Sequence, residues 1–276
     1  MPSSRGEVAA AVVRGRIHVV GAYSDGSNLN EAYDPATDLW QTLAPLPRGV
    51  HHTSAASIGD RLYVVGGYDT STNLPVTSAW VYDPVVDQWA SIAPLSSARG
   101  ALGMASTGDR LYAIGGEAGR NVPANEMYSP EEDRWYPAQP LPTPRDHLAI
   151  AVWSNQIYVI GGRATNISMS LTMNEAYDPS SDTWRAMAPM LTGRSGIAGA
   201  ALNGRIYVFG GEDPIKTFNE NEAYDVATDT WQSHPSMPTA RHGLAAAASG
   251  DSIYVIAGGR TPGAAESDLN EVYQPS

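Results

Sequence analysis

The stretch Ile206-Tyr207-Val208-Phe209-Gly210-Gly211, continued by Asn221-Glu222-Ala223-Tyr224-Asp225 and by Trp231, decides the fold of this chain. Its first run is β-branched and aromatic and ends at two glycines, which predicts a short strand that enters a turn. The second run ends at Asp225, a residue type that starts turns because its side chain accepts backbone hydrogen bonds. Trp231 follows Tyr224 by seven residues and opens a third extended segment.

The same arrangement occurs six times, with 45 to 49 residues between like positions. Glycine doublets begin at Gly66, Gly115, Gly161, Gly210 and Gly258, with a degenerate Gly21-Ala22 in front. The tyrosines are Tyr33, Tyr82, Tyr128, Tyr177, Tyr224 and Tyr273, and the tryptophans are Trp40, Trp89, Trp135, Trp184 and Trp231. A period near 50 with four short extended segments per repeat is typical of a propeller blade.

These residues resemble the kelch family, and the resemblance covers the whole chain. It implies an all-β, six-bladed kelch-type β-propeller that forms a single domain over residues 1–276. The expected blades span about 5–47, 48–97, 98–143, 144–192, 193–239 and 240–276. The tryptophans Trp89, Trp135, Trp184 and Trp231 are expected to be mostly buried, each against the next blade.

The last blade is expected to lack its outermost strand within this chain. Six copies of the first three strands are present, but only five tryptophan-bearing fourth strands. Residues 1–5 match residues 237–241, the segment that normally follows such a strand, so the closing strand is expected just before residue 1. A segment upstream of residue 1, or a neighbouring chain, is a candidate to pair with this edge.

Composition narrows the functional classes. The formal net charge is −12 and the pI is about 4.8, which disfavours binding to nucleic acid or to anionic membranes. The absence of cysteine excludes disulfides, cysteine metal sites and cysteine nucleophiles. No apolar run approaches the length of a membrane span and no signal-peptide pattern begins the chain, so the sequence leaves the compartment open.

An arginine precedes the first strand of every repeat: Arg5, Arg48, Arg99, Arg145, Arg194 and Arg241. One interpretation is an anion site at the axis. The other is structural, with each guanidinium bound to its own turn and to a carboxylate such as the glutamate of the third strand, and this one is favoured because the arginine repeats with the blade.

Two positions vary between repeats, namely those just after the glycine doublet and just after the repeated arginine. In kelch domains whose partner peptides dock at the axis, these positions line the mouth of the channel. The resemblance therefore implies a binding rim of Tyr23, Tyr68, Glu117, Asp146, His147, Arg163, Ser195, Glu212, His242 and Arg260.

The leading functional hypothesis is a non-catalytic binding module that engages a protein or peptide, or a small polar ligand, at the axial face. No catalytic residue and no cofactor is assigned. No metal site is expected either, because His51 and His52 are adjacent on a strand and point to opposite sides. The alternative is a carbohydrate-active enzyme that resembles a sialic-acid epimerase or mutarotase, with Glu117, Glu212, His147 and Arg163 as its acid, base and anchoring groups. Convergence of these groups around a deep pocket would favour the enzyme, and a shallow wide rim would favour partner binding.

Overall fold

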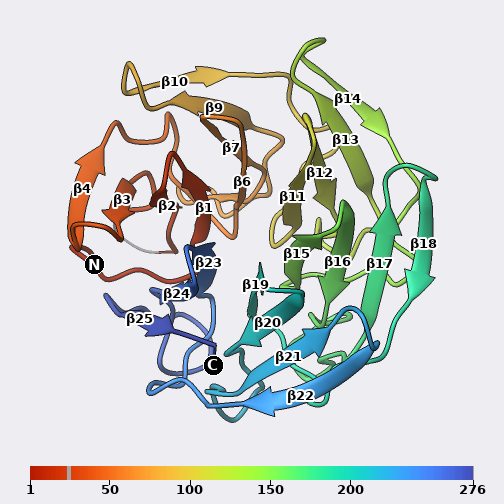
Figure 1. The fold of residues 1–276 in the computed structure, drawn as a ribbon. Coiled ribbons are helices and arrows are strands. Elements are labelled where there is room, and N and C mark those ends of the chain that lie inside the picture. The colour runs from red at the N-terminus through yellow and green to blue at the C-terminus, as the bar shows by residue number, and fades with distance from the viewer. Residues whose placement is uncertain (24–25, 276) are drawn as a thin grey trace.

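The computed structural model is a ring of antiparallel sheets around a central axis, and it describes residues 1–23 and 26–275 (Figure 1). Five sheets have four strands each and a sixth has three, and the described residues contain no helix. The expected all-β propeller with six blades is therefore confirmed. No helix in this part of the chain has the length and apolarity to cross a membrane.

The strands of each blade run outward from the axis in chain order. The innermost are β1 (Ala9–Val13), β6 (Ser54–Ile58), β11 (Gly103–Thr107), β15 (Ala149–Trp153), β19 (Ala198–Leu202) and β23 (Ala245–Ser249). The second strands are β2 (Arg16–Val20), β7 (Arg61–Val65), β12 (Arg110–Ile114), β16 (Gln156–Ile160), β20 (Arg205–Phe209) and β24 (Ser252–Ile256). The third are β3 (Asn30–Asp34), β9 (Ala79–Asp83), β13 (Asn125–Ser129), β17 (Asn174–Asp178), β21 (Asn221–Asp225) and β25 (Asn270–Tyr273). The outermost are β4 (Leu39–Leu43), β10 (Gln88–Ser91), β14 (Arg134–Pro137), β18 (Thr183–Ala186) and β22 (Thr230–His234), and a two-stranded ribbon joins β5 (Val50–His51) to β8 (Tyr68–Asp69).

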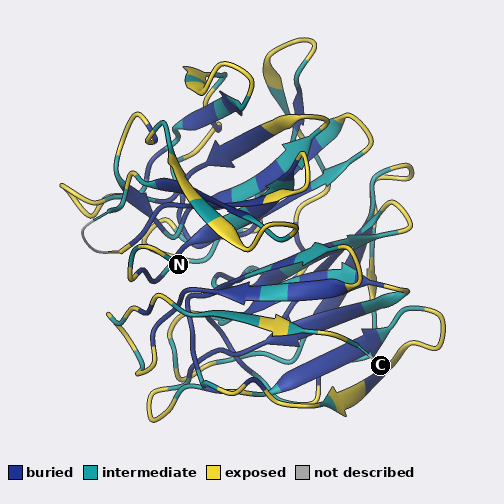
Figure 2. Ribbon diagram, turned by 60° about the vertical axis from the view of Figure 1, so that its left-hand side comes forward, coloured by how far each residue is buried: buried dark blue, intermediate teal, exposed yellow. Residues whose placement is uncertain are grey.

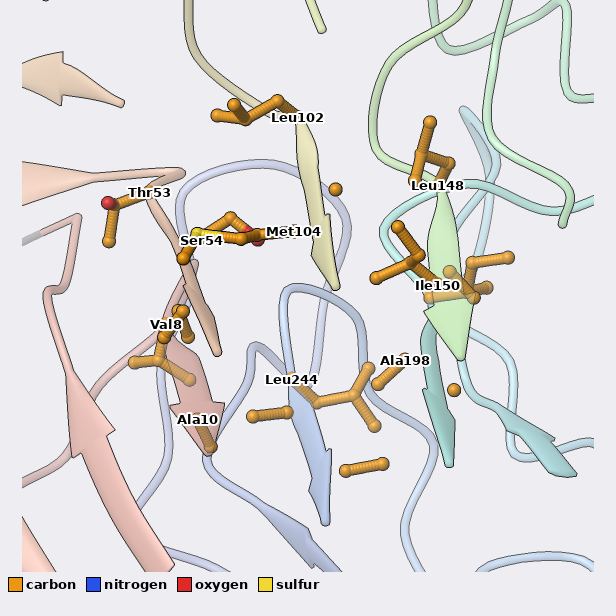
Figure 3. A pocket seen from close by; sticks show the side chains of 18 residues that line it. Val8, Ala10, Thr53, Ser54, Leu102, Met104, Leu148, Ile150, Ala198 and Leu244 are labelled. Atoms are coloured by element: carbon orange, nitrogen blue, oxygen red, sulfur yellow. The ribbon is translucent and has the colours of Figure 1, made fainter. Parts of the chain in front are cut away.

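Side-chain size follows the distance of a strand from the axis. The innermost strands are rich in alanine, glycine and serine because they contact one another around a narrow channel of about 180 Å³ (Figure 3). The second strands are covered on both faces by neighbouring sheets, and residues such as Ile206 and Val208 are fully buried. Buried residues are accordingly concentrated in the inner strands, and exposed ones in the connecting loops and the outermost strands (Figure 2).

The repeated tyrosine and tryptophan join one blade to the preceding one. The Tyr177 hydroxyl donates to the carboxylate of Asp182, and the Trp184 ring lies against Tyr177 with its Nε1–H donating to the Gln139 carbonyl of the preceding blade. Equivalent bonds recur at Trp89, Trp135 and Trp231. These tryptophans are mostly buried, as expected: Trp231 is buried and the other three are of intermediate exposure. The expected neighbour was wrong, because the indole bonds the preceding blade and not the next one.

The structural interpretation of the arginines is confirmed in five blades. Each of these guanidinium groups has no solvent exposure and forms an ion pair with the glutamate of its own third strand, namely Arg5–Glu31, Arg99–Glu126, Arg145–Glu175, Arg194–Glu222 and Arg241–Glu271. Four of the five also donate to a buried backbone carbonyl fourteen residues further along the chain. These five arginines are therefore paired and buried, and they do not form an anion site at the axis.

The second blade departs from this pattern. Arg48 is half-exposed and pairs with Asp69, while fully buried Val50 lies where the other blades have their arginine. The Val50 carbonyl accepts from the Ala22 amide, as the Arg99 carbonyl accepts from the Gly67 amide. Opposite Val50, Trp80 replaces the glutamate, so an apolar pair substitutes for the ion pair.

The sixth blade has only the strands β23, β24 and β25 among the described residues, as the strand count predicts. The N-terminal segment lies beside this blade, because the Arg5 amide donates to the Ser267 carbonyl and the Met1 amino group to the Asp268 carbonyl. The outer edge of β25 has no partner strand in the described structure.

Candidate functional site

A closed ring of six backbone hydrogen bonds surrounds the axis at one end of the channel. One residue from each blade contributes, always two positions after the buried arginine or its Val50 equivalent: Glu7, His52, Ala101, His147, Gly196 and Gly243. Each amide donates to the carbonyl of the ring residue in the preceding blade at 2.8–3.1 Å, and the Glu7 amide closes the circle on the Gly243 carbonyl. We call these six residues the axial ring.

All six ring residues have left-handed backbone dihedrals, with φ between 50° and 64°. This conformation costs energy for a residue with a side chain, and it persists where the surrounding structure enforces it. The closed hydrogen-bond circle supplies that enforcement at Glu7, His52, Ala101 and His147. Their side-chain directions are consequently fixed by the whole propeller and not by a flexible loop.

A mostly apolar layer lies next to the ring along the axis. It consists of the residue that follows each ring residue, namely Val8, Thr53, Leu102, Leu148, Ile197 and Leu244, around a cavity of about 80 Å³. On the other side of the ring the loops surround a wider pocket of about 480 Å³. We call this wider space the axial pocket.

The structure brings six of the ten predicted rim residues to the wall of the axial pocket: Tyr23, Glu117, Asp146, His147, Arg163 and Glu212. Tyr68 and His242 lie directly behind this wall, where the Tyr68 hydroxyl donates to the Glu117 carboxylate and His242 Nδ1 lies 3.3 Å from Glu7 Oε1. Ser195 is fully buried, and its hydroxyl accepts from Ser170, so it does not face the pocket. The role of these residues in binding stays a prediction.

Arg260 does not belong to this set. Its side chain is exposed, and the residue that pairs with His242 at the equivalent position is Gly259. In the sixth blade the left-handed pair is Ala257-Gly258 and not Gly258-Gly259, which shifts the position by one residue.

Among the pocket-lining residues that the rim prediction missed are two members of the axial ring, Glu7 and His52. His52 was missed because Arg48 was aligned with the other arginines, which places Gly49 and Val50 at the rim instead of His51 and His52. In the third blade the arginine Arg99 lies sixteen residues before the first glycine of the doublet, Gly115. The same spacing from Gly66 gives Val50, and an alignment of the second blade on this spacing matches the structure.

Arg163 is the centre of one half of the pocket. Its guanidinium lies 3.0 Å from Asp146 Oδ1, 3.5 Å from Glu212 Oε1 and 3.0 Å from His147 Nε2. His147 Nδ1 in turn contacts the Asp146 carboxylate. Burial alone would raise the pKa of Asp146, but His147 and Arg163 outweigh it and hold that pKa below its usual range.

Glu7 is the centre of the other half. Its carboxylate lies 3.3 Å from His52 Nε2 and 3.3 Å from His242 Nδ1, and Glu212 Oε2 lies 3.4 Å from the same His242 atom. Burial lowers the pKa of His52 to about 3, so this imidazole is neutral near pH 7. Burial also opposes the charged form of His242, but Glu7 and Glu212 raise its pKa overall.

An aromatic cluster lies behind one side of the pocket and reaches it at Tyr23. The His51 ring stacks on Tyr68 with centroids 5.3 Å apart, and Tyr23 meets His51 edge-on at 4.9 Å. Tyr23 is 45% exposed and lies at the mouth. Four carboxylates and one guanidinium line the space, so the pocket is net negative and favours a cationic occupant.

Comparisons with known proteins agree with the fold and its repeats. A family model described as "KLHDC2/KLHL20/DRC7 Kelch-repeats domain" matches residues 101–274, more than half of the chain, and a "Kelch motif" model matches residues 50–96. The solved structure of YjhT superposes with a TM-score of 0.88 over 100% of this chain and 99% of that one, at 14% sequence identity. At this identity the likeness concerns the fold.

Curated relatives match over shorter segments. Kelch-like protein 35 of Homo sapiens is 39% identical over 59 residues, which are 21% of this chain and 10% of the relative. Human Kelch-like protein 4 is 48% identical over 48 residues, or 17% and 7% of the two chains, and mouse Kelch-like protein 1 is 50% identical over 44 residues, or 16% and 6%. The aligned segments thus span a tenth or less of the length of these relatives.

Proposed function

The chain belongs to the kelch-repeat family, and on this premise we propose that it is an interaction module whose axial pocket binds a basic segment of a protein or peptide partner. The observation that carries the proposal is the convergence of carboxylates in the pocket. Glu7, Glu117, Asp146 and Glu212 come from four different blades and line one space with a single guanidinium. A lysine or arginine side chain of the partner supplies the charge that this space favours.

The dimensions of the pocket suit side chains better than a folded domain. A space of about 480 Å³ accommodates one or two long side chains, while the rest of the partner rests on the surrounding loops. Glu117 and Glu7 are partly exposed and available to an incoming cation, whereas Asp146 and Glu212 are buried and already paired with Arg163. Tyr23 at the mouth adds an aromatic face that favours cationic groups.

The test is a selection from a random hexapeptide library with the purified protein, followed by affinity measurements on the selected peptides. We expect enrichment of lysine and arginine, binding that weakens with added salt, and an affinity loss of about tenfold in Glu117→Gln, the effect of losing one charge-assisted contact. Glu131→Gln is the matched control, because Glu131 is exposed in the turn between β13 and β14. Selection of acidic or neutral peptides, or equal binding by Glu117→Gln and wild type, would contradict the proposal.

A carbohydrate-active enzyme remains a second candidate, supported by one observation. Glu117, Glu212, His147 and Arg163 all line the axial pocket, so acid, base and guanidinium groups do lie together. Against an acidic sugar, Asp146 and Glu212 already occupy the guanidinium of Arg163. Magnetisation-transfer NMR on sialic acid and on neutral sugars tests this candidate. Faster anomeric exchange with wild type than with Glu212→Gln would favour the enzyme, and unchanged exchange would exclude mutarotation of these sugars.

A further inference from the structure

Three side chains of the axial ring point to one place. A carboxylate oxygen of Glu7 and one imidazole nitrogen each of His52 and His147 lie within 4.8 Å of one another. The three residues come from different blades but occupy the same ring position, and their backbones are held by the same circle of hydrogen bonds. The cluster is therefore preorganised by the ring.

A chain of hydrogen bonds fixes the tautomer of His52. His51 donates from Nε2 to Asn73 Oδ1 at 3.1 Å, which leaves its Nδ1 as an acceptor. His52 Nδ1 lies 2.5 Å from that atom and must be the donor, so the lone pair of His52 is on Nε2. This lone pair faces Glu7 Oε2 at 3.3 Å. Two acceptors at this distance attract each other only through a cation between them.

His147 is arranged in the same way. Its Nδ1 contacts the Asp146 carboxylate, which fixes the proton on Nδ1 and leaves the lone pair on Nε2. A carboxylate behind the second nitrogen is the usual support for a metal-binding histidine, because it orients the ring and raises its basicity. Arg163 now donates to Nε2 at 3.0 Å, and metal binding displaces this one bond while Asp146 and Glu212 continue to hold the guanidinium.

The neighbouring ring positions leave room for the cluster. A Cβ atom at Gly243 would lie 2.6 Å from Glu7 Oε1, so only glycine lets this carboxylate reach the axis. Leu148 and Leu244 of the apolar layer lie on the side of the ring that faces the channel.

We propose that Glu7, His52 and His147 bind a divalent first-row transition-metal ion at the floor of the axial pocket. Two imidazoles and one carboxylate are a ligand set that suits such ions, with Zn²⁺ the best match to three protein ligands and an open position. Ligand atoms about 2.1 Å from a tetrahedral ion lie roughly 3.4 Å apart. The distance between His52 Nε2 and Glu7 Oε2 already fits, and His147 closes the remaining gap by side-chain rotation. The open position faces the pocket, where a water molecule or a polar group of a ligand completes the coordination.

The test is a titration of chelator-treated, folded protein with Zn²⁺ by calorimetry and with Co²⁺ by visible absorption, without any peptide. We expect one equivalent per chain, with Co²⁺ bands typical of low coordination number. Binding should weaken at least about tenfold in Glu7→Gln and be lost in His52→Asn. Asparagine tolerates the left-handed backbone at this position, so the second variant keeps its ring geometry.

His234→Gln is the matched control, because His234 lies on the outer strand β22 against Tyr273, and it should bind like wild type. Circular dichroism and melting temperature establish that each variant is folded. Absence of stoichiometric binding by wild type, or wild-type affinity in both Glu7→Gln and His52→Asn, would overturn the inference. The inference does not rest on the proposed peptide binding, since the metal titration uses no peptide and the peptide test depends on Glu117.

Discussion

The buried pair Arg99–Glu126 and its four counterparts have an apolar equivalent within the same chain. Val50 and Trp80 occupy the corresponding positions in the second blade, both buried. A buried ion pair offsets its desolvation cost only when both partners are present, whereas an apolar pair of similar volume carries no such cost. The same buried position is therefore filled by an ion pair in five blades and by an apolar pair in the second blade.

We predict that Arg99→Val alone destabilises the protein by about 3–5 kcal/mol, because it leaves the Glu126 carboxylate buried without its partner. The double variant Arg99→Val/Glu126→Trp, which copies the second blade, should recover most of this loss. Urea unfolding of both single variants and the double variant measures the coupling. Additive losses in the double variant would contradict the argument.

A second position also departs from the repeat. Tyr63, Tyr112, Tyr158, Tyr207 and Tyr254 occupy the third position of their second strands, and each ring contacts a tyrosine of the next blade. The first blade has His18 there, buried against Tyr82. A pocket of about 410 Å³ between the first and second blades borders this histidine.

His18 makes stability sensitive to acid. Burial lowers its pKa, with nearby Arg16 acting in the same direction and the bond to Asn30 only partly opposing. Below about pH 6.5 the imidazole of His18 takes up a proton in the unfolded chain but not in the folded protein. The free energy of unfolding therefore keeps its full value above that pH and decreases as the pH falls below it.

We predict that His18→Tyr stabilises the protein by about 0.5–2 kcal/mol through cavity filling. It should also reduce the stability difference between pH 7.5 and pH 5.5 by about 1 kcal/mol. Melting temperatures of variant and wild type at the two pH values check both effects. An unchanged pH dependence would show that His18 is not a source of the acid sensitivity.

At the scale of elements, the third strand of the sixth blade differs from its counterparts. β21 lies between β20 and β22, and four of its five residues are buried. β25 pairs only with β24, and none of its residues is buried. Beside it, Phe209, Pro235, Met237 and Tyr273 line a mostly apolar cavity of about 210 Å³.

We predict that β25 has the fastest amide exchange of the third strands, because half of its backbone groups face solvent. Exchange measured by NMR should show much stronger protection in β21 than in β25. A β25 protected as well as β21 would mean that another chain or segment covers its edge in solution.

At the scale of the whole molecule, the repeated features were predictable and the site was predictable only in part. Glycine doublets, tyrosines and tryptophans recur within short stretches of sequence. They correctly predict six sheets and a last blade with three strands in this chain. The rim prediction failed where the register of a blade shifts, by two residues before Val50 in the second blade and by one before Arg260 in the sixth. The cluster of Glu7, His52 and His147 depends on backbone bonds between residues more than forty positions apart, which no local pattern encodes.

The central claim is that side chains from all around the propeller converge at the axial ring to form one binding site. The ring amides of Glu7, His52, Ala101, His147, Gly196 and Gly243 lie directly at the floor of this site, far along the chain from one another. A ligand in the axial pocket must perturb several of them together.

The most direct test is amide chemical-shift mapping on ¹⁵N-labelled protein titrated with a basic hexapeptide from the library. We predict saturable shifts at the ring amides and at Tyr23 and Glu117, with no change in the outer strands β4, β10, β14 and β18. Shifts confined to β25 or to the outer strands, with the ring amides unchanged, would contradict the account.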